Sequence, residues 1–192
     1  MNPALELASA AFHLTDQHPR VRRVFEFAHE RHAGQRRDVD GAPFVTHPLE
    51  VASILSEHNY PDHVVAAGLL HDVLEKSDTD PAELEARFGV PVASLVMAVT
   101  DDPAIGDDGE RRAALRLQVA QAGDEAAAIF AADKISKARE MRDRARRGAL
   151  DGDSLARLEH YQESSEMLEE LLPGRPLIAE LMREMRALTR QR

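Results

Sequence analysis

DHVVAAGLLHDVLEK, residues 62–76, contains the apolar run that decides the fold, Val64 to Leu70. Seven apolar residues in a row predict a buried helix rather than a helix with one apolar face. The run is far shorter than the roughly 20 residues that a helix needs to cross a bilayer, so we expect no membrane partner. Elsewhere in the chain, apolar residues recur at intervals of three and four, whereas the alternation typical of strands is hard to find. The sequence therefore predicts an all-α fold, a compact helical bundle.

Capping and turn signals divide this bundle into helices. Asp80 precedes Pro81 and Glu83, which together satisfy the free backbone amides at a helix start, and Gly89 ends the same helix. A chain of 192 residues has the size of one domain, so residues 1–192 are expected to form a single domain. The first 15 residues suggest no more than a packing helix. The predicted helices cover residues 20–33, 48–58, 63–76, 81–88, 90–99, 110–122, 124–147, 153–172 and 176–190.

Composition excludes several classes of function. The chain has 24 Lys and Arg against 34 Asp and Glu, a net charge of −10, which is the wrong sign for a protein that wraps extended nucleic acid. It has no cysteine, so disulfides, thiolate zinc sites and cysteine nucleophiles are ruled out, and any metal must be held by His and carboxylate. A reducing compartment fits this composition, and we expect a cytoplasmic protein.

His71 and Asp72 follow the apolar run directly. A carboxylate that enters a low-dielectric core needs a cation or several hydrogen-bond donors. A divalent metal would satisfy both residues, since imidazole nitrogen and carboxylate oxygen suit Mn, Fe, Zn, Co or Ni. Glu75 would lie on the same helical face and could hold a metal-bound water without being a ligand. The alternative is a helix that has reached the surface, and these residues alone do not decide between the two.

Two more residues could belong to such a centre. His47 stands beside Pro48, which is suited to the first position of a helix and would fix the histidine at the helix entry. Taken alone, a histidine in the position of His47 is more often an ordinary capping residue than a ligand. Asp133 ends a second apolar stretch, and its alternative is a surface ion pair with Lys137. We predict surface or helix-capping roles for five other histidines on the predicted helices or near their ends: His29, His32, His58, His63 and His160.

Four blocks of the sequence carry a family resemblance: GAPFVTHPLEVASIL, AAGLLHDVLEKSDTD, FGVPVASLVMAVTDD and AADKISKARE. They resemble the HD-domain hydrolases of the RelA/SpoT type, in particular the single-domain small alarmone hydrolases. The blocks have the family's order and spacing over roughly residues 20–165. The resemblance implies an all-α fold that holds one Mn²⁺ and hydrolyses the 3′-pyrophosphate of guanosine tetra- and pentaphosphate with a metal-activated water. Some single-domain members act on the phosphate of NADPH.

The same resemblance assigns roles to individual residues. Glu75 would orient or deprotonate the attacking water. The implied metal ligands are His47, His71, Asp72 and Asp133. The implied substrate contacts are Arg36, Arg37, Lys134, Lys137, Arg157 and Tyr161, the last two in an Arg-x-x-x-Tyr spacing on the late helix. The implied partner is a small nucleotide, and self-association into a homo-oligomer is a further expectation.

This chain departs from the family at two positions. Lys76 stands in the catalytic segment where the family usually has Asp after the Glu, and Lys137 stands where Asn is common. Loss of a catalytic acid or base typically lowers the rate by about 10² to 10⁴. Lys76 could pair with Asp72 and weaken the metal, or it could reach a substrate phosphate. Two alternatives to alarmone hydrolysis therefore stay open: an HD hydrolase for another nucleotide or phosphoester, and a degenerate protein that binds a metal or nucleotide without hydrolysis.

Overall fold

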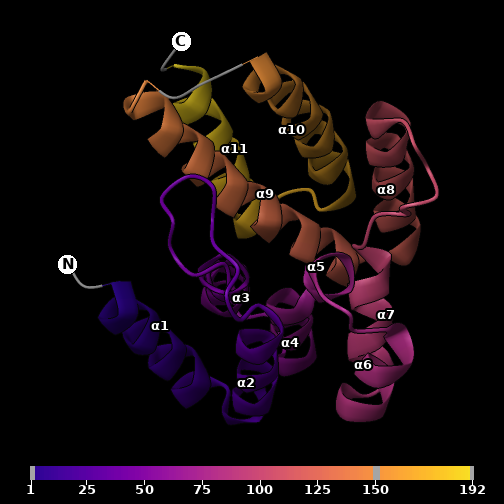
Figure 1. The fold of residues 1–192 in the computed structure, drawn as a ribbon. Coiled ribbons are helices and arrows are strands. Elements are labelled where there is room, and N and C mark those ends of the chain that lie inside the picture. The colour runs from indigo at the N-terminus through magenta and orange to yellow at the C-terminus, as the bar shows by residue number, and fades with distance from the viewer. Residues whose placement is uncertain (1–2, 149–151, 191–192) are drawn as a thin grey trace. The chain divides into compact units, whose positions relative to one another are not determined.

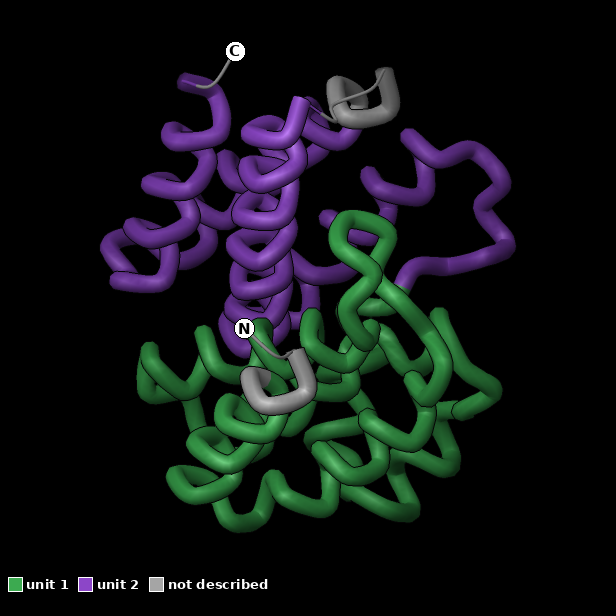
Figure 2. The backbone as a smooth tube through the Cα atoms, turned by 60° about the vertical axis from the view of Figure 1, so that its left-hand side comes forward, with its two compact units in different colours: residues 1–100 green, residues 101–192 purple. Residues whose placement is uncertain are grey.

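The computed structural model describes residues 3–148 and 152–190. Within these ranges the protein is all-α, as predicted, and its one β-type contact is an isolated antiparallel bridge between Arg36 and Pro43. The chain divides into two compact units, residues 1–100 and residues 101–192 (Figure 2). No described helix is both long enough and apolar enough to span a membrane.

Unit 1 is built around a short buried helix, α4. Its residues 64–70 are buried on every side, because α4 packs against α2, α3 and α7 (Figure 1). A Cβ atom on Gly68 would lie 2.6 Å from the Leu55 side chain, so this glycine allows α3 to approach closely. The helices of the unit are α1 (Pro3–Gln17), the 3₁₀ helix η1 (Pro19–Val21), α2 (Arg22–Arg31), α3 (Thr46–Glu57), α4 (Asp62–Leu70), α5 (Val73–Lys76), α6 (Pro81–Phe88) and α7 (Val90–Ala98).

The prediction of one continuous helix over residues 63–76 is wrong. Helix α4 ends at Leu70, and α5 begins at Val73, so His71 and Asp72 form a turn between two helices. His71 Nδ1 lies 2.9 Å from the carbonyl oxygen of Gly68, which the Asp72 amide would use in an uninterrupted helix. The imidazole therefore competes with the backbone at the point where the helix breaks.

Most other predicted boundaries agree with the structure to within about two residues. The carboxylate of Asp80 accepts a hydrogen bond from the Glu83 amide at 2.8 Å, which confirms the predicted cap. Gly89 follows α6 with φ of +86°, a left-handed value that favours glycine. Helix α3 begins at Thr46, two residues earlier than predicted, so His47 belongs to its first turn.

Unit 2 is built around the long helix α9, which packs against the other three helices of the unit (Figure 1). Residues 126–136 of α9 are buried. Arg139 on α9 forms ion pairs with Glu180 at 2.5 Å and Glu184 at 3.2 Å, and these bonds tie α9 to α11. The helices are α8 (Asp108–Ala122), α9 (Asp124–Arg146), α10 (Gly152–Leu171) and α11 (Pro176–Thr189).

Candidate metal centre

Three of the predicted metal ligands meet inside unit 1. His47 comes from the first turn of α3, and His71 and Asp72 come from the turn between α4 and α5. All three are buried, with 4%, 5% and 5% of their surface exposed. Asp72 Oδ2 lies 3.4 Å from His71 Nε2 and 3.7 Å from His47 Nε2. The alternative in which His71 and Asp72 are solvated at the surface is therefore wrong.

The donor atoms of these residues fit a divalent cation. The Gly68 carbonyl can only accept, so His71 Nδ1 carries the hydrogen and Nε2 presents a lone pair toward Asp72 Oδ2. A lone pair and a carboxylate oxygen this close repel each other, and a cation bound between them would turn that repulsion into attraction. Ligand atoms that are each about 2.0–2.2 Å from one ion lie roughly 3.0–3.6 Å apart, which matches this spacing. A histidine that donates its other ring hydrogen to a backbone carbonyl is also the usual arrangement around metal ligands.

Glu75 and Lys76 lie on α5, and both are exposed. The ammonium of Lys76 lies 5.2 Å from the centre of the Phe44 ring, in cation–π geometry. Phe44 in turn packs against the His47 ring, with centroids 6.0 Å apart. The sequence suggests Asp72 or a substrate phosphate as partners for Lys76, and the contact with the Phe44 ring is one that local sequence does not indicate.

The two predicted cationic contacts before His47 occupy different positions. Arg36 is exposed on the segment between α2 and α3, and its guanidinium contacts the Gly41 carbonyl at 3.3 Å. Arg37 is half-buried and contacts the hydroxyl of Thr46, the first residue of α3, at 3.5 Å. Arg37 is thus the cation that the structure brings to the helix end bearing His47.

Sequence reasoning missed His32. Its predicted surface or capping role is correct only in that it caps α2, since 3% of the residue is exposed. Burial lowers the pKa of its imidazole. The helical period could have predicted that His32 is buried, because Val24, Ala28 and His32 are spaced four residues apart and so share one face of the helix. All three are buried in the structure.

In unit 2, Asp133 is buried on α9, with 4% exposed. Its Oδ2 lies 2.9 Å from the ammonium groups of both Lys134 and Lys137. The predicted ion pair between Asp133 and Lys137 exists, but it does not lie at the surface, because the Asp133 carboxylate is buried. Burial lowers the pKa of Lys134, and the charge of Asp133 opposes that shift.

Tyr161 lies close to the same lysine. The Lys134 ammonium is 5.7 Å from the centre of the Tyr161 ring and 4.0 Å from that of Phe130. Burial raises the pKa of the Tyr161 hydroxyl, so it stays protonated near neutral pH. Two of the predicted substrate contacts, Lys134 and Tyr161, thus occur side by side within unit 2.

Arg157 lines a different feature of unit 2, a pocket of about 560 Å³ between α8 and α10. Arg112, Arg116 and His160 line the same pocket. Burial lowers the pKa of His160 to about 3, and the charges of Lys134 and Arg116 add to the effect. The neutral ring accepts a hydrogen bond at Nδ1 from Arg116 over 2.8 Å, so His160 is a half-buried partner of an arginine rather than a surface or capping residue.

His160 should make the fold sensitive to acid. An exposed histidine has a pKa of about 6.5, so between that pH and about 3 the unfolded chain binds a proton that the folded chain does not. The corresponding contribution to the free energy of unfolding is present above about pH 6.5 and is lost as the pH falls. His160→Asn should therefore lessen the drop in urea midpoint between about pH 7 and about pH 4.5, whereas the exposed control His29→Asn should not. An unchanged pH dependence in His160→Asn would contradict this assignment.

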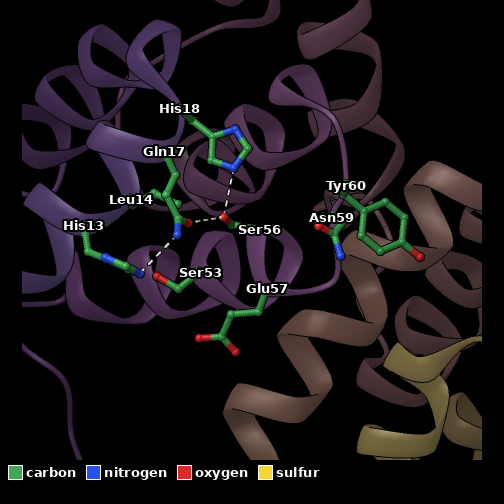
Figure 3. Close-up of a pocket in the computed structure, with 9 residues that line it drawn as sticks. All are labelled: His13, Leu14, Gln17, His18, Ser53, Ser56, Glu57, Asn59 and Tyr60. Carbon is green, nitrogen blue, oxygen red and sulfur yellow. Dashed lines mark hydrogen bonds between the residues drawn. The ribbon is translucent and has the colours of Figure 1, made fainter.

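A further pocket in unit 1, of about 450 Å³, lies beside α1 and α3 (Figure 3). His18 connects it to α4, since its ring contacts Ser56 Oγ at 2.8 Å and Asp62 Oδ1 at 2.7 Å. Gln17 extends the network by accepting from the Ser56 hydroxyl at 3.0 Å. None of the residues lining this pocket belongs to the predicted site, and we assign its hydrogen bonds to holding the helices together.

Comparison with protein families decides the classification. The HD domain model matches residues 24–157. The chain belongs to the HD-domain family. The match includes all four predicted ligands and ends at Arg157. HD-domain hydrolases use divalent metal ions, in agreement with the donor set of unit 1.

Similar proteins define the branch of the HD-domain family. The guanosine-3′,5′-bis(diphosphate) 3′-pyrophosphohydrolase MESH1 of Danio rerio is 39% identical over 143 residues, which cover 71% of this chain and 75% of the relative. MESH1 of Homo sapiens is 42% identical over 122 residues, covering 60% of this chain and 66% of the relative. The guanosine-3′,5′-bis(diphosphate) 3′-pyrophosphohydrolase of Aquifex aeolicus is 40% identical over 50% of this chain, and the match spans only 14% of that longer protein.

Solved structures agree with this placement. The structure described as a metazoan ortholog of SpoT that hydrolyzes ppGpp superposes with a TM-score of 0.74 at 27% identity, covering 89% of this chain and 94% of the other. A Listeria monocytogenes structure superposes with a TM-score of 0.65 at 29% identity, covering 75% and 99%. The predicted resemblance and the predicted class, an HD-domain hydrolase related to alarmone pyrophosphohydrolases, are thus confirmed.

Proposed function

We propose that this HD-domain hydrolase cleaves the 3′-pyrophosphate from guanosine tetra- or pentaphosphate. The observation that carries the proposal is the approach of His47 Nε2 and His71 Nε2 to Asp72 Oδ2, at 3.7 and 3.4 Å. The substrate follows from the activity for which the Danio rerio relative is named, and the match covers 75% of that relative. In the reaction, the oxygen of a water molecule bonds to the phosphorus atom that is attached to the ribose 3′ oxygen. The bond between this phosphorus and the ribose 3′ oxygen breaks, so pyrophosphate is released and the ribose keeps a 3′ hydroxyl.

The proposed metal set is His47, His71, Asp72 and Asp133, with Mn²⁺ as the ion. Support for Asp133 is the match of AADKISKARE to the family together with its burial on α9. Two imidazoles and two carboxylates are ligands that Mn²⁺ accepts, and they leave coordination positions open. A bound divalent ion lowers the pKa of a coordinated water and polarises a phosphoryl oxygen.

The remaining assignments concern the chain's own groups around the substrate. Glu75 is proposed to orient the attacking water and to take its proton. Lys76 is proposed as a supporting catalytic residue whose charge, held over Phe44, favours the anionic substrate. The proposed phosphate and ribose contacts are Arg36, Arg37, Lys134, Lys137, Arg157 and Tyr161. Lys137 departs from the family's Asn, and its bond to Asp133 Oδ2 supports a role in holding that carboxylate as well.

Purified protein with Mn²⁺ and guanosine tetraphosphate should release pyrophosphate and guanosine diphosphate in equal amounts. A screen of NADPH and other nucleotides, in which released phosphate or pyrophosphate is measured, distinguishes guanosine tetraphosphate from another phosphoester as the substrate. Absence of turnover on guanosine tetraphosphate by protein that holds its metal would overturn the substrate assignment. Turnover on a different nucleotide in that case would leave the hydrolase class intact.

Three other expectations remain proposals for this chain. They are the single-domain organisation of residues 1–192, a cytoplasmic location, and association into a homo-oligomer. Sedimentation of the purified chain measures the last of these directly.

A further inference from the structure

The side chain of Gln35 connects the end of α2 to the end of α5. Its Nε2 lies 2.6 Å from the backbone oxygen of Lys76, and its Oε1 lies 2.9 Å from His32 Nδ1. The Lys76 carbonyl can only accept, so the NH₂ group of Gln35 faces it and the amide oxygen faces the histidine. His32 Nδ1 therefore donates to Gln35. These two bonds fix both the amide orientation and the tautomer of the ring.

His32 is a rigid anchor for this connection. It caps the C-terminal end of α2 and is 3% exposed. Its ring packs against Phe44, with centroids 4.9 Å apart. Phe44 also carries the Lys76 ammonium on its face, so the segment between α2 and α3 holds the end of α5 through both the backbone and the side chain of one residue.

Helix α5 needs such support because it is only four residues long. Helices of this length are unstable on their own, and their last carbonyl groups lack partners within the helix. Gln35 supplies a donor to the carbonyl of the last residue of α5. Glu75 directly precedes that residue, and Asp72 directly precedes the helix. The direction of α5 therefore sets where the Glu75 carboxylate lies with respect to the metal ligands.

We propose that His32 and Gln35 are positioning residues that act through the Lys76 carbonyl to hold α5, and with it Glu75, in place beside the metal ligands. The inference rests on the proposed function, because the role of Glu75 belongs to it. His32 and Gln35 thus have a positioning role, although neither is a proposed metal ligand or a predicted substrate contact. The direction of α5 is maintained by these side-chain contacts, since a helix of four residues has too few backbone bonds of its own.

A double-mutant cycle tests whether Gln35 acts through Glu75. Gln35→Met keeps the length of the side chain and removes both bonds, and it should lower kcat about 10- to 100-fold, because displacements near 1 Å have effects of this size. In the Glu75→Gln background the same change should lower kcat less than about twofold. Equal losses in the two backgrounds would overturn the proposal, since a general structural role does not depend on Glu75.

Amide hydrogen exchange on the metal-free protein gives a readout that does not need turnover. The amides of Lys76 and Ser77 bond within this turn, to Asp72 and Val73, at 3.0 and 3.1 Å. Gln35→Met should speed their exchange about fivefold or more, the effect of losing one hydrogen bond. Gln17→Met, which removes an amide from the hydrogen-bond network beside α1, is the control and should leave both rates unchanged.

The histidine is tested by a conservative pair of variants. His32→Asn retains an N–H group for Gln35 and should keep exchange closer to wild type than His32→Phe, which retains only the ring packing. Unchanged amide exchange at residues 76 and 77 in Gln35→Met would overturn the positioning role of Gln35 even if the enzyme hydrolyses guanosine tetraphosphate. Faster exchange in a protein without turnover on that nucleotide would support the positioning role and count only against the substrate assignment.

Discussion

Replacing Asp72 with Asn should remove the metal and lower kcat/KM by more than about 10²-fold. Changes to groups that merely support ligands already cost about 10- to 100-fold in metal affinity or activity, and Asp72 Oδ2 lies 3.7 and 3.4 Å from the Nε2 atoms of His47 and His71. The measurement is metal content by elemental analysis together with the rate of pyrophosphate release.

The fold itself should survive this change. In the metal-free protein, the amide of Asn at position 72 can donate to His71 Nε2, where the carboxylate only accepts. Metal-free Asp72→Asn should therefore unfold at a temperature at least as high as metal-free wild type. Asp78→Asn, a nearby surface acid paired with Arg31 at 3.0 Å, serves as the matched control. Retention of a full metal complement by Asp72→Asn would show that Asp72 is not a ligand.

Glu75→Gln should lower kcat by about 10² to 10⁴, the usual effect of losing a general base, while metal content stays at the wild-type level. The amide keeps the shape of the side chain but cannot take a proton from water. The combination of lost turnover and retained metal separates this role from that of the ligands. Glu85→Gln changes another exposed acid of unit 1 and should leave the rate unchanged. Wild-type turnover in Glu75→Gln would reassign the base.

The presence of Lys76 does not require a loss of hydrolysis. Its ammonium is engaged with the face of Phe44, a contact worth about 0.5–2 kcal/mol, and its carbonyl is bonded to Gln35. The positive charge is thus held by an aromatic ring beside His47. A residue that looks like a charge reversal in the sequence is built into the packing of α5.

Much of the fold follows from local pattern. The apolar period of 3.6 predicts helices throughout, and the caps at Asp80 and Gly89 act where the sequence places them. The break at His71 could not be predicted in this way, because it depends on an imidazole that takes the carbonyl of Gly68. Periodicity reports which side chains are apolar, and it does not report which side chains bond to the backbone.

The candidate site shows the same division. The position of His71 and Asp72 after an apolar run made them candidate ligands, since a buried acid needs a cation. His47 became a candidate ligand rather than a capping residue only through the family resemblance. His32 was missed because the three residues before it, His29 to Arg31, are polar, although it shares the buried helix face of Val24 and Ala28. The link from Gln35 to the Lys76 carbonyl joins residues 41 positions apart, and no local pattern encodes it.

Elemental analysis of the purified protein shows whether the imidazoles of His47 and His71 and the carboxylate of Asp72 bind a catalytic divalent ion. We expect about one divalent metal ion per chain, with manganese restoring full content after chelation, and less than a tenth of that content in Asp72→Asn. A folded wild-type protein that takes up no stoichiometric divalent ion, even when Mn²⁺ is supplied, would contradict this expectation.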